Sequence, residues 1–386
     1  MPADFQKEMA MLNRMLFVFA ALALLLIPAA ALAGPLFPMQ LGGHYDYDGS
    51  DNLGHTWKCQ LQVMASGISL NGQTYFHLRQ VNGDPIDTNR HNPQDMLVRC
   101  TDTQAYISMG SSEALQFQTG PTSTPSWTTL DGQTALITSA TSNITVPAGT
   151  FNPSFENKFT EGTNPSWYAY LYPNLGLVKQ VDHWVAAGRD PAILALRATG
   201  TAPVSLFPMK TGMRLIFNVS DAKNNKWQMH MQILEQVSIG GKTYFHGCQT
   251  NYDLIGGNLK RDMYFRSTDK ELYVSDGVNE HIHFQAAGPG TSWDFPASIG
   301  TQYMQITAIT PINVLGGSYL AYAHDSHYEE PGFVSPHFID YMVPGLGIAQ
   351  MVDWWTEDPA RAPLTFTLTK ITQGGAGPSL NLLLLD

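Results

Sequence analysis

The sequence has little charge for its length. Only 14% of its 386 residues are Asp, Glu, Lys or Arg, against roughly 25% in an average soluble domain. Acidic residues outnumber basic ones by 32 to 21, and the formal net charge is −11. Because no basic stripe is present to neutralise phosphates, nucleic acid and anionic membrane surfaces are poor partners.

The sequence also has few cysteines. Cys59, Cys100 and Cys248 allow at most one intrachain disulfide. Cys59 and Cys100 lie in the same half of the chain, so they are the candidate pair. The alternative is three small buried side chains.

Short catalytic motifs are missing. The chain has no serine-hydrolase elbow, metalloprotease helix, phosphate-binding loop or zinc-ribbon spacing, and no cofactor is indicated. This favours a protein that is not an enzyme, although carboxylate pairs of the glycosidase type would leave no short motif.

The N-terminus resembles a secretory signal peptide. Arg14 precedes an apolar run at 15–27, and Ala31-Leu32-Ala33 precedes Gly34. A basic segment, an apolar segment and a small-x-small site are typical of cleavable signals, and the apolar run is short for a membrane span. We therefore predict export to the periplasm or the extracellular space, with no transmembrane span in the mature chain. An N-terminal anchor is the alternative.

The mature sequence contains two similar copies. "LFPM" occurs at 36–39 and again at 206–209, and "NGQTYFH" at 71–77 matches "GGKTYFH" at 240–246. Other matching motifs keep the same order at nearly the same offset, which indicates a tandem duplication. The predicted division is a signal peptide, a first β-domain repeat, a second β-domain repeat, and a Gly-rich linker with a short apolar tail, at 1–33, 34–198, 205–373 and 374–386.

Apolar residues alternate with polar ones in both copies. Around Trp57 and again around Trp227, every second residue is apolar and the phase is the same. A period of two indicates a half-buried antiparallel strand. Many short segments of this kind, separated by turns, predict an all-β protein with two tandem curved antiparallel sheets, each an open half-barrel or a sandwich.

Several of these motifs carry a family resemblance. They are the opening "LFPM", the "NGQTYF" hairpin, "VPAGTF" at 146–151 and "YPNLGLVKQV" at 172–181. Together they resemble a family of bacterial secreted or periplasmic domains of unknown function, similar in fold to the periplasmic lipoprotein carriers. The resemblance covers most of 36–185 and is weaker in the second copy. It implies an open half-barrel with an apolar concave face.

Histidines gather in the second copy and suggest a metal site. "HIHF" places His281 and His283 on one face of a strand, and "HDSHYEEP" adds His324 and His327. Neutral imidazoles with nearby carboxylates suit a transition metal. We list His281, His283, His324 and His327 as candidate ligands; the alternative is a solvated polar loop.

Two further sets are candidates for ligand binding. Arg99 follows Asp95 by four residues, as Arg266 follows Asp262, so each pair predicts either a structural ion pair or an arginine that recognises a ligand. Aromatic side chains on a concave sheet could stack on sugars or line an apolar pocket. The candidate tryptophans are Trp184, Trp354 and Trp355.

The function that these features favour is an exported, non-enzymatic binding protein. It would hold an apolar or amphipathic ligand, or a surface polymer, on the concave faces or between the copies. One alternative is a cell-envelope interaction module that uses sheet edges and the C-terminal tail; another is a metal-dependent hydrolase that uses the histidines and glutamates of the second copy. The possible partners are therefore a lipid, a glycan or an envelope protein.

Overall fold

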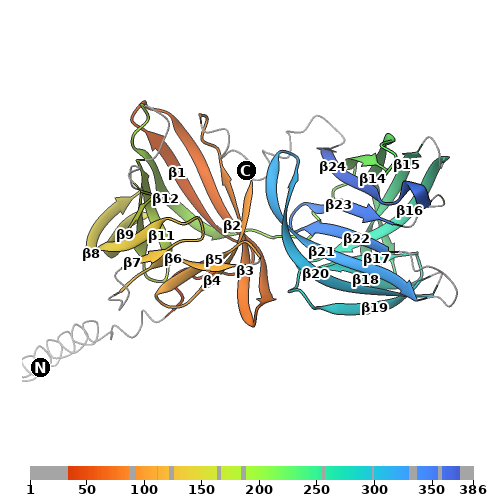
Figure 1. Ribbon diagram of the computed structural model, residues 1–386, viewed down its shortest axis with the longest axis horizontal. Helices are drawn as coiled ribbons and strands as arrows, with labels where there is room; N and C mark the ends of the chain where they lie inside the picture. The colour runs from red at the N-terminus through yellow and green to blue at the C-terminus, as the bar shows by residue number, and fades with distance from the viewer. Residues whose placement is uncertain are drawn as a thin grey trace, which may run out of the picture.

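The computed structural model describes residues 34–86, 93–110, 112–120, 126–162, 167–183, 188–253, 257–297, 300–329, 337–354 and 359–373. Within these ranges the protein has 24 strands, a short 3₁₀ helix η2 (Pro359–Arg361) and no α-helix. The prediction of an all-β protein with open, curved antiparallel sheets is confirmed (Figure 1).

Twelve strands form what we call the N-terminal half. They are β1 (Gly43–Asp51), β2 (Thr56–Leu70), β3 (Gln73–Asn82), β4 (Gln94–Cys100), β5 (Gln104–Ser108), β6 (Glu113–Gln118), β7 (Ser126–Thr128), β8 (Thr134–Val146), β9 (Gly149–Thr160), β10 (Trp167–Tyr172), β11 (Gly176–Asp182) and β12 (Ala192–Thr201).

The remaining twelve form the C-terminal half. They are β13 (Arg214–Ser220), β14 (Lys226–Ile239), β15 (Lys242–Asp253), β16 (Gly257–Ser267), β17 (Glu271–Ser275), β18 (Glu280–Gln285), β19 (Ser292–Ala297), β20 (Gly300–Val314), β21 (Gly317–Glu329), β22 (His337–Val343), β23 (Gly347–Asp353) and β24 (Leu364–Thr372).

The two halves have the same strand order. Each is an antiparallel meander whose last strand returns to pair with its first, β12 with β1 and β24 with β13. The edge strands are β6 and β7 in one half and β18 and β19 in the other. Register shifts also correspond, because the bulge after Asp46 is matched after Ile216 and the bulge after Val63 is matched after Ile233. A long sheet that curls in this way buries its inner face without a second sheet.

A side chain bridges the opening between the edge strands in each half. Asn157 of β9 accepts from the Gln118 N–H and donates to the Gln118 carbonyl, both at 2.9 Å. In the C-terminal half, Nε2 of His324 on β21 lies 2.8 Å from the Gln285 carbonyl and 3.3 Å from its N–H. Asn157 therefore takes the place of a strand partner for both backbone groups of Gln118, whereas the single nitrogen of His324 can bond only one backbone group of Gln285 at a time.

The "LFPM" segments fill the two sheet interiors. Phe37 is 6% exposed and Phe207 is fully buried, and each ring packs against a glycine that begins β11 or β23. A Cβ on Gly176 would lie 2.1 Å from the Phe37 ring, and a Cβ on Gly347 would lie 2.3 Å from the Phe207 ring. The "LFPM" segment and the glycine after Leu175 or Leu346 thus make the same contact in each half.

A buried arginine ties together the end of each sheet. Arg189 donates to Asp51 and Asp84, with a shortest distance of 2.8 Å to each carboxylate, and lies over the Trp57 ring. The C-terminal half has the same arrangement, formed by Arg361, Asp221, Asp253 and Trp227. These groups satisfy one another, so they are structural rather than available to a ligand.

The three cysteines form no disulfide. Cys59 is 2% exposed in the N-terminal core, and Cys100 packs against that core. The candidate pair of Cys59 with Cys100 is therefore not formed, and the burial of Cys59 agrees with the alternative of a small core side chain.

Candidate functional site

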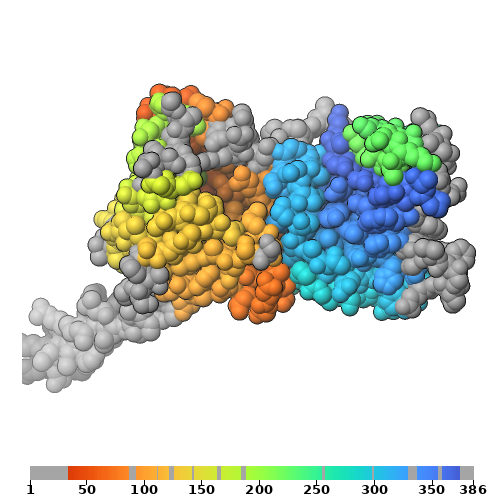
Figure 2. Space-filling view, in the orientation of Figure 1, coloured from red at the N-terminus to blue at the C-terminus, as the bar shows by residue number. Residues whose placement is uncertain are grey.

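The outer face of β2, β3 and β4 packs against β20 and β21 of the other half (Figure 1). Ala65, Ile68 and Leu97 of the N-terminal half are fully buried within the large C-terminal core cluster. Residue Gln94 of β4 also pairs in parallel with Ser318 of β21. The space-filling view shows the two halves in continuous contact along this line (Figure 2).

A buried ionic cluster lies in this interface. Arg79 donates to Asp95 through Nε at 2.7 Å, and His77 Nε2 lies 2.9 Å from the same carboxylate. Asp95 also accepts from the Leu320 N–H of β21 at 3.2 Å, and His77 contacts the Tyr322 hydroxyl at 3.2 Å. Burial alone would raise the pKa of Asp95, but Arg79 and His77 lower it to about 2. The cluster therefore holds a charged carboxylate at the junction of the halves.

The matching position in the C-terminal half faces solvent. Asp262 of β16 contacts His246 at 3.1 Å, as Asp95 contacts His77, but its side chain is 64% exposed. Where the N-terminal half has Arg79, the register places Cys248 opposite Asp262. The ionic cluster is thus specific to the face that the other half covers.

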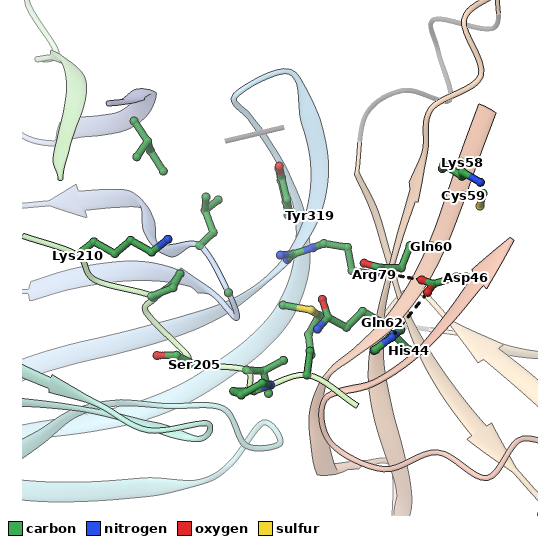
Figure 3. A pocket seen from close by; sticks show the side chains of 18 of the residues that line it. His44, Asp46, Lys58, Cys59, Gln60, Gln62, Arg79, Ser205, Lys210 and Tyr319 are labelled. Atoms are coloured by element: carbon green, nitrogen blue, oxygen red, sulfur yellow. Dashed lines mark hydrogen bonds and ion pairs between the residues drawn. The ribbon is translucent and has the colours of Figure 1, made fainter. Parts of the chain in front are cut away.

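A groove of about 410 Å³ lies beside this interface (Figure 3). Its walls come mainly from β1 and β2, from the segment that joins the halves, and from several parts of the C-terminal half. Pockets of this size hold small ligands. The interiors of the two curved sheets, by contrast, are occupied by core side chains.

The β1–β2 wall of the groove is polar. Asp46 accepts from Gln60 at 2.8 Å and lies 3.8 Å from His44 Nε2 and 3.5 Å from Arg197. These residues point outward because alternation sends their neighbours Tyr45 and Tyr47 into the core, where they are 5% and 1% exposed. Figure 3 shows His44, Asp46 and Gln60 together on this side.

The facing wall is largely apolar. The connecting segment and the C-terminal half contribute to it the apolar residues Ala202, Pro203, Val204, Pro208, Met213, Leu346 and Ile371, together with the polar residues Ser205, Lys210, Tyr319 and Gln373. The segment is fixed at its start, since the Ala202 N–H donates to the Gly42 carbonyl at 2.8 Å. The groove therefore places apolar surface opposite hydrogen-bonding and charged groups. The repeats predicted at 34–198 and 205–373 leave this segment between them, but no sequence pattern indicates that it forms a wall.

The two candidate arginines do not line the groove. Arg99 donates to Glu113 at 2.8 Å and lies over the Tyr106 ring; Arg266 does the same with Glu280 and Tyr273. The predicted pairing with the aspartate four residues earlier is wrong. Four residues along a strand span roughly 13 Å, whereas β6 and β18 bring a glutamate within reach. Both guanidinium groups are neutralised, so ligand recognition by them stays an unsupported prediction.

Of the candidate tryptophans, only Trp354 lies within the described residues; Trp184 and Trp355 do not. Trp354 is 39% exposed and stacks on His337 with ring centroids 4.8 Å apart. It does not line the groove.

The four candidate metal ligands are not gathered in one place. His281 and His283 lie on β18 with ring centroids 5.9 Å apart. His324 is buried, but His327, three residues further along β21, points to the opposite face and stacks on Tyr303. Among the described residues, no three His, Cys, Asp or Glu side chains are arranged to hold a metal ion.

Ser326, His324 and Asp340 share one face of β21 and β22, yet they do not form a catalytic triad. His324 Nδ1 lies 2.9 Å from the Tyr322 carbonyl and Nε2 lies 2.8 Å from the Gln285 carbonyl. Both imidazole nitrogens therefore face backbone groups and not Ser326, whose hydroxyl is buried without a hydrogen-bond partner among the described residues. A triad needs a free imidazole nitrogen beside the nucleophile.

Asp340 makes the stability of the C-terminal half depend on pH. Burial, and then the charge of Asp353, raise the pKa of Asp340 from 3.8 to about 7. Between pH 3.8 and pH 7 the folded protein keeps the Asp340 proton, whereas the unfolded chain releases it. The stability that this proton contributes is therefore fully present below pH 3.8 and is lost as the pH rises through 7. We expect Asp340→Asn to stabilise the protein more at pH 8 than at pH 5, by about 1–3 kcal/mol.

Urea unfolding at the two pH values measures this difference. Asp294→Asn, at an exposed aspartate of the same half, is the matched control and should show no change with pH. An equal effect of Asp340→Asn at pH 5 and pH 8 would contradict the assignment.

No known family model matches the chain, and no curated protein matches it. Three solved structures show weak similarity. A candidate exported protein of Bacteroides fragilis with a YmcC-like fold is 12% identical, with a TM-score of 0.32, over 45% of this chain and 100% of its own. A candidate lipoprotein of Parabacteroides distasonis is also 12% identical, with a TM-score of 0.31 and the same coverage.

The third structure is a candidate AttH protein of Nitrosomonas europaea, 9% identical with a TM-score of 0.18, over 85% of this chain and 92% of its own. These scores are too low to establish a shared fold or function. No helix in the described ranges has the length and apolar character to cross a bilayer.

Proposed function

We propose that this chain is an exported, non-enzymatic binding protein and that an amphipathic ligand lies in the groove between its two halves. The observation that carries the proposal is the pairing of an apolar wall, on the connecting segment and the C-terminal half, with a polar wall on β1 and β2. Such a groove suits a molecule with an apolar part and a polar end.

Export is supported by the signal-like sequence of residues 1–33, which lie outside the described residues. The paired strand orders and bulges support an origin by tandem duplication, with repeats at 34–198 and 205–373. The packed ionic interface supports a groove of fixed width, because Asp95 links β4 directly to β21.

The first test is native mass spectrometry of the mature protein purified from its own export compartment, followed by denaturing mass spectrometry. A bound mass that disappears on denaturation would support the proposal, and its size would distinguish a lipid from a glycan. A bare protein mass that also fails to bind added lipids would contradict it.

A matched pair of variants locates the site. Gln62 on β2 lines the groove, and Gln232 occupies the same place on β14, opposite Arg214 as Gln62 is opposite His44. We expect Gln62→Trp to fill the groove and weaken binding of single-chain lipids at least about tenfold, near 1.4 kcal/mol. Gln232→Trp, at an exposed position outside the groove, should leave binding unchanged. Equal effects of the two variants would place the site elsewhere.

A further inference from the structure

We infer that the ligand of the groove is an anion, with a long-chain carboxylate as the fitting chemistry, and that Lys210 pairs with its charge. This inference rests on the proposed function of the groove and goes beyond it by assigning the sign of the ligand's polar end.

The first argument is the balance of charge in the groove. Four cations line it, Lys58, Arg79, Arg197 and Lys210. Three carboxylates balance them, since Lys58 pairs with Asp48, Arg79 with Asp95, and Arg197 with both Asp46 and Asp48. One positive charge is left over within a protein whose net charge is −11. A local excess of this sign favours an anionic partner.

The second argument is that the remaining charge is Lys210. No carboxylate of the described residues lies within ion-pair distance of its ammonium group, and the residue is exposed. Its backbone is fixed, because the Met213 N–H donates to the Lys210 carbonyl at 3.0 Å. Figure 3 shows its side chain extending toward the groove from the C-terminal half. A positioned, unneutralised ammonium is a donor for a carboxylate or a phosphate.

The third argument is a comparison with the other half. Where β1 and β2 carry Asp48 and Lys58, the same register positions of β13 and β14 carry Asn218 and Gln228. At these positions the face that borders the groove therefore carries an ion pair, and the matching face of the other half carries neutral side chains.

The test uses three probes with similar chains and different ends: oleate, monoolein and oleylamine, titrated into the delipidated mature protein. We expect oleate to bind at least about tenfold more tightly than monoolein, and oleylamine to bind weakest. Lys210→Glu should weaken oleate binding at least about tenfold and leave monoolein binding unchanged. Lys270→Glu changes the net charge equally at an exposed lysine outside the groove and should change neither.

Two results would overturn this inference while leaving the groove as the site. One is monoolein or oleylamine binding as tightly as oleate; the other is Lys210→Glu weakening all three probes alike. If none of the three binds, the proposed function itself fails, and the inference fails with it. If oleate does bind, a lipid with a phosphate end and a similar chain shows whether the groove prefers a carboxylate or accepts any anion.

Discussion

Replacing Asp95 by alanine should lower the free energy of unfolding by about 3–5 kcal/mol, because it leaves a buried arginine without its counter-ion. Arg79 is 3% exposed and donates two hydrogen bonds to this carboxylate, one from Nε at 2.7 Å and one from a terminal nitrogen at 2.9 Å. The variant also removes the acceptor of the Leu320 N–H. The N-terminal half loses the Arg79 contact, and the hydrogen bond from Leu320 that crosses to the C-terminal half is lost with it.

The control for this experiment lies within the same chain. Asp262→Ala removes the aspartate at the matching position of the C-terminal half, where the side chain is 64% exposed, and should cost no more than about 0.5 kcal/mol. Urea unfolding followed by tryptophan fluorescence compares the two. Equal losses for Asp95→Ala and Asp262→Ala would show that the buried cluster does not stabilise the interface.

The same carboxylate predicts acid sensitivity of the junction. The pKa of Asp95 is lowered to about 2 from an ordinary value of 3.8. Its contribution is therefore complete above pH 3.8 and lost as the pH falls toward 2, the opposite sense to that of Asp340. Two aspartates in one protein thus respond to pH in opposite directions because one has a buried cation beside it and the other has not.

The fold class was predictable from the sequence because strand periodicity is local. The alternation around Trp57 predicted a strand with Trp57, Cys59 and Val63 inward, and these are 7%, 2% and 0% exposed on β2. The same rule could have separated His324 from His327. Their odd spacing puts them on opposite faces once 317–329 is a strand rather than a loop.

The groove was not predictable because its walls meet only through packing between the halves. No local pattern shows that Lys210 and His44 border one space, or that Arg99 reaches Glu113 two strands away. Such contacts depend on sheet curvature and on which outer face is covered. The repeated motifs correspond to contacts that both halves make. The contacts at the junction use positions at which the two halves differ, such as Arg79 and Cys248.

Replacing Gly347 by alanine should cost about 2–5 kcal/mol, and Gly176→Ala should cost a similar amount. Both glycines have positive φ, 90° and 87°, which costs an alanine roughly 1–2 kcal/mol. The new Cβ would also lie 2.3 Å or 2.1 Å from a buried phenylalanine ring, and overpacking of this kind typically costs about 1–3 kcal/mol more.

Gly54→Ala separates these two costs. Gly54 has a φ of 85°, but a Cβ there would meet no atom within 4 Å, so this variant should lose only the conformational part, about 1–2 kcal/mol. Adding Phe37→Leu should recover part of the loss in Gly176→Ala, because a smaller side chain makes room for the methyl group. Equal losses for Gly54→Ala and Gly176→Ala, with no recovery in the double variant, would mean that the two repeated motifs are not held together by this contact. We expect instead that each "LFPM" segment packs inside its sheet only because the facing residue is a glycine, which leaves room for the phenylalanine ring.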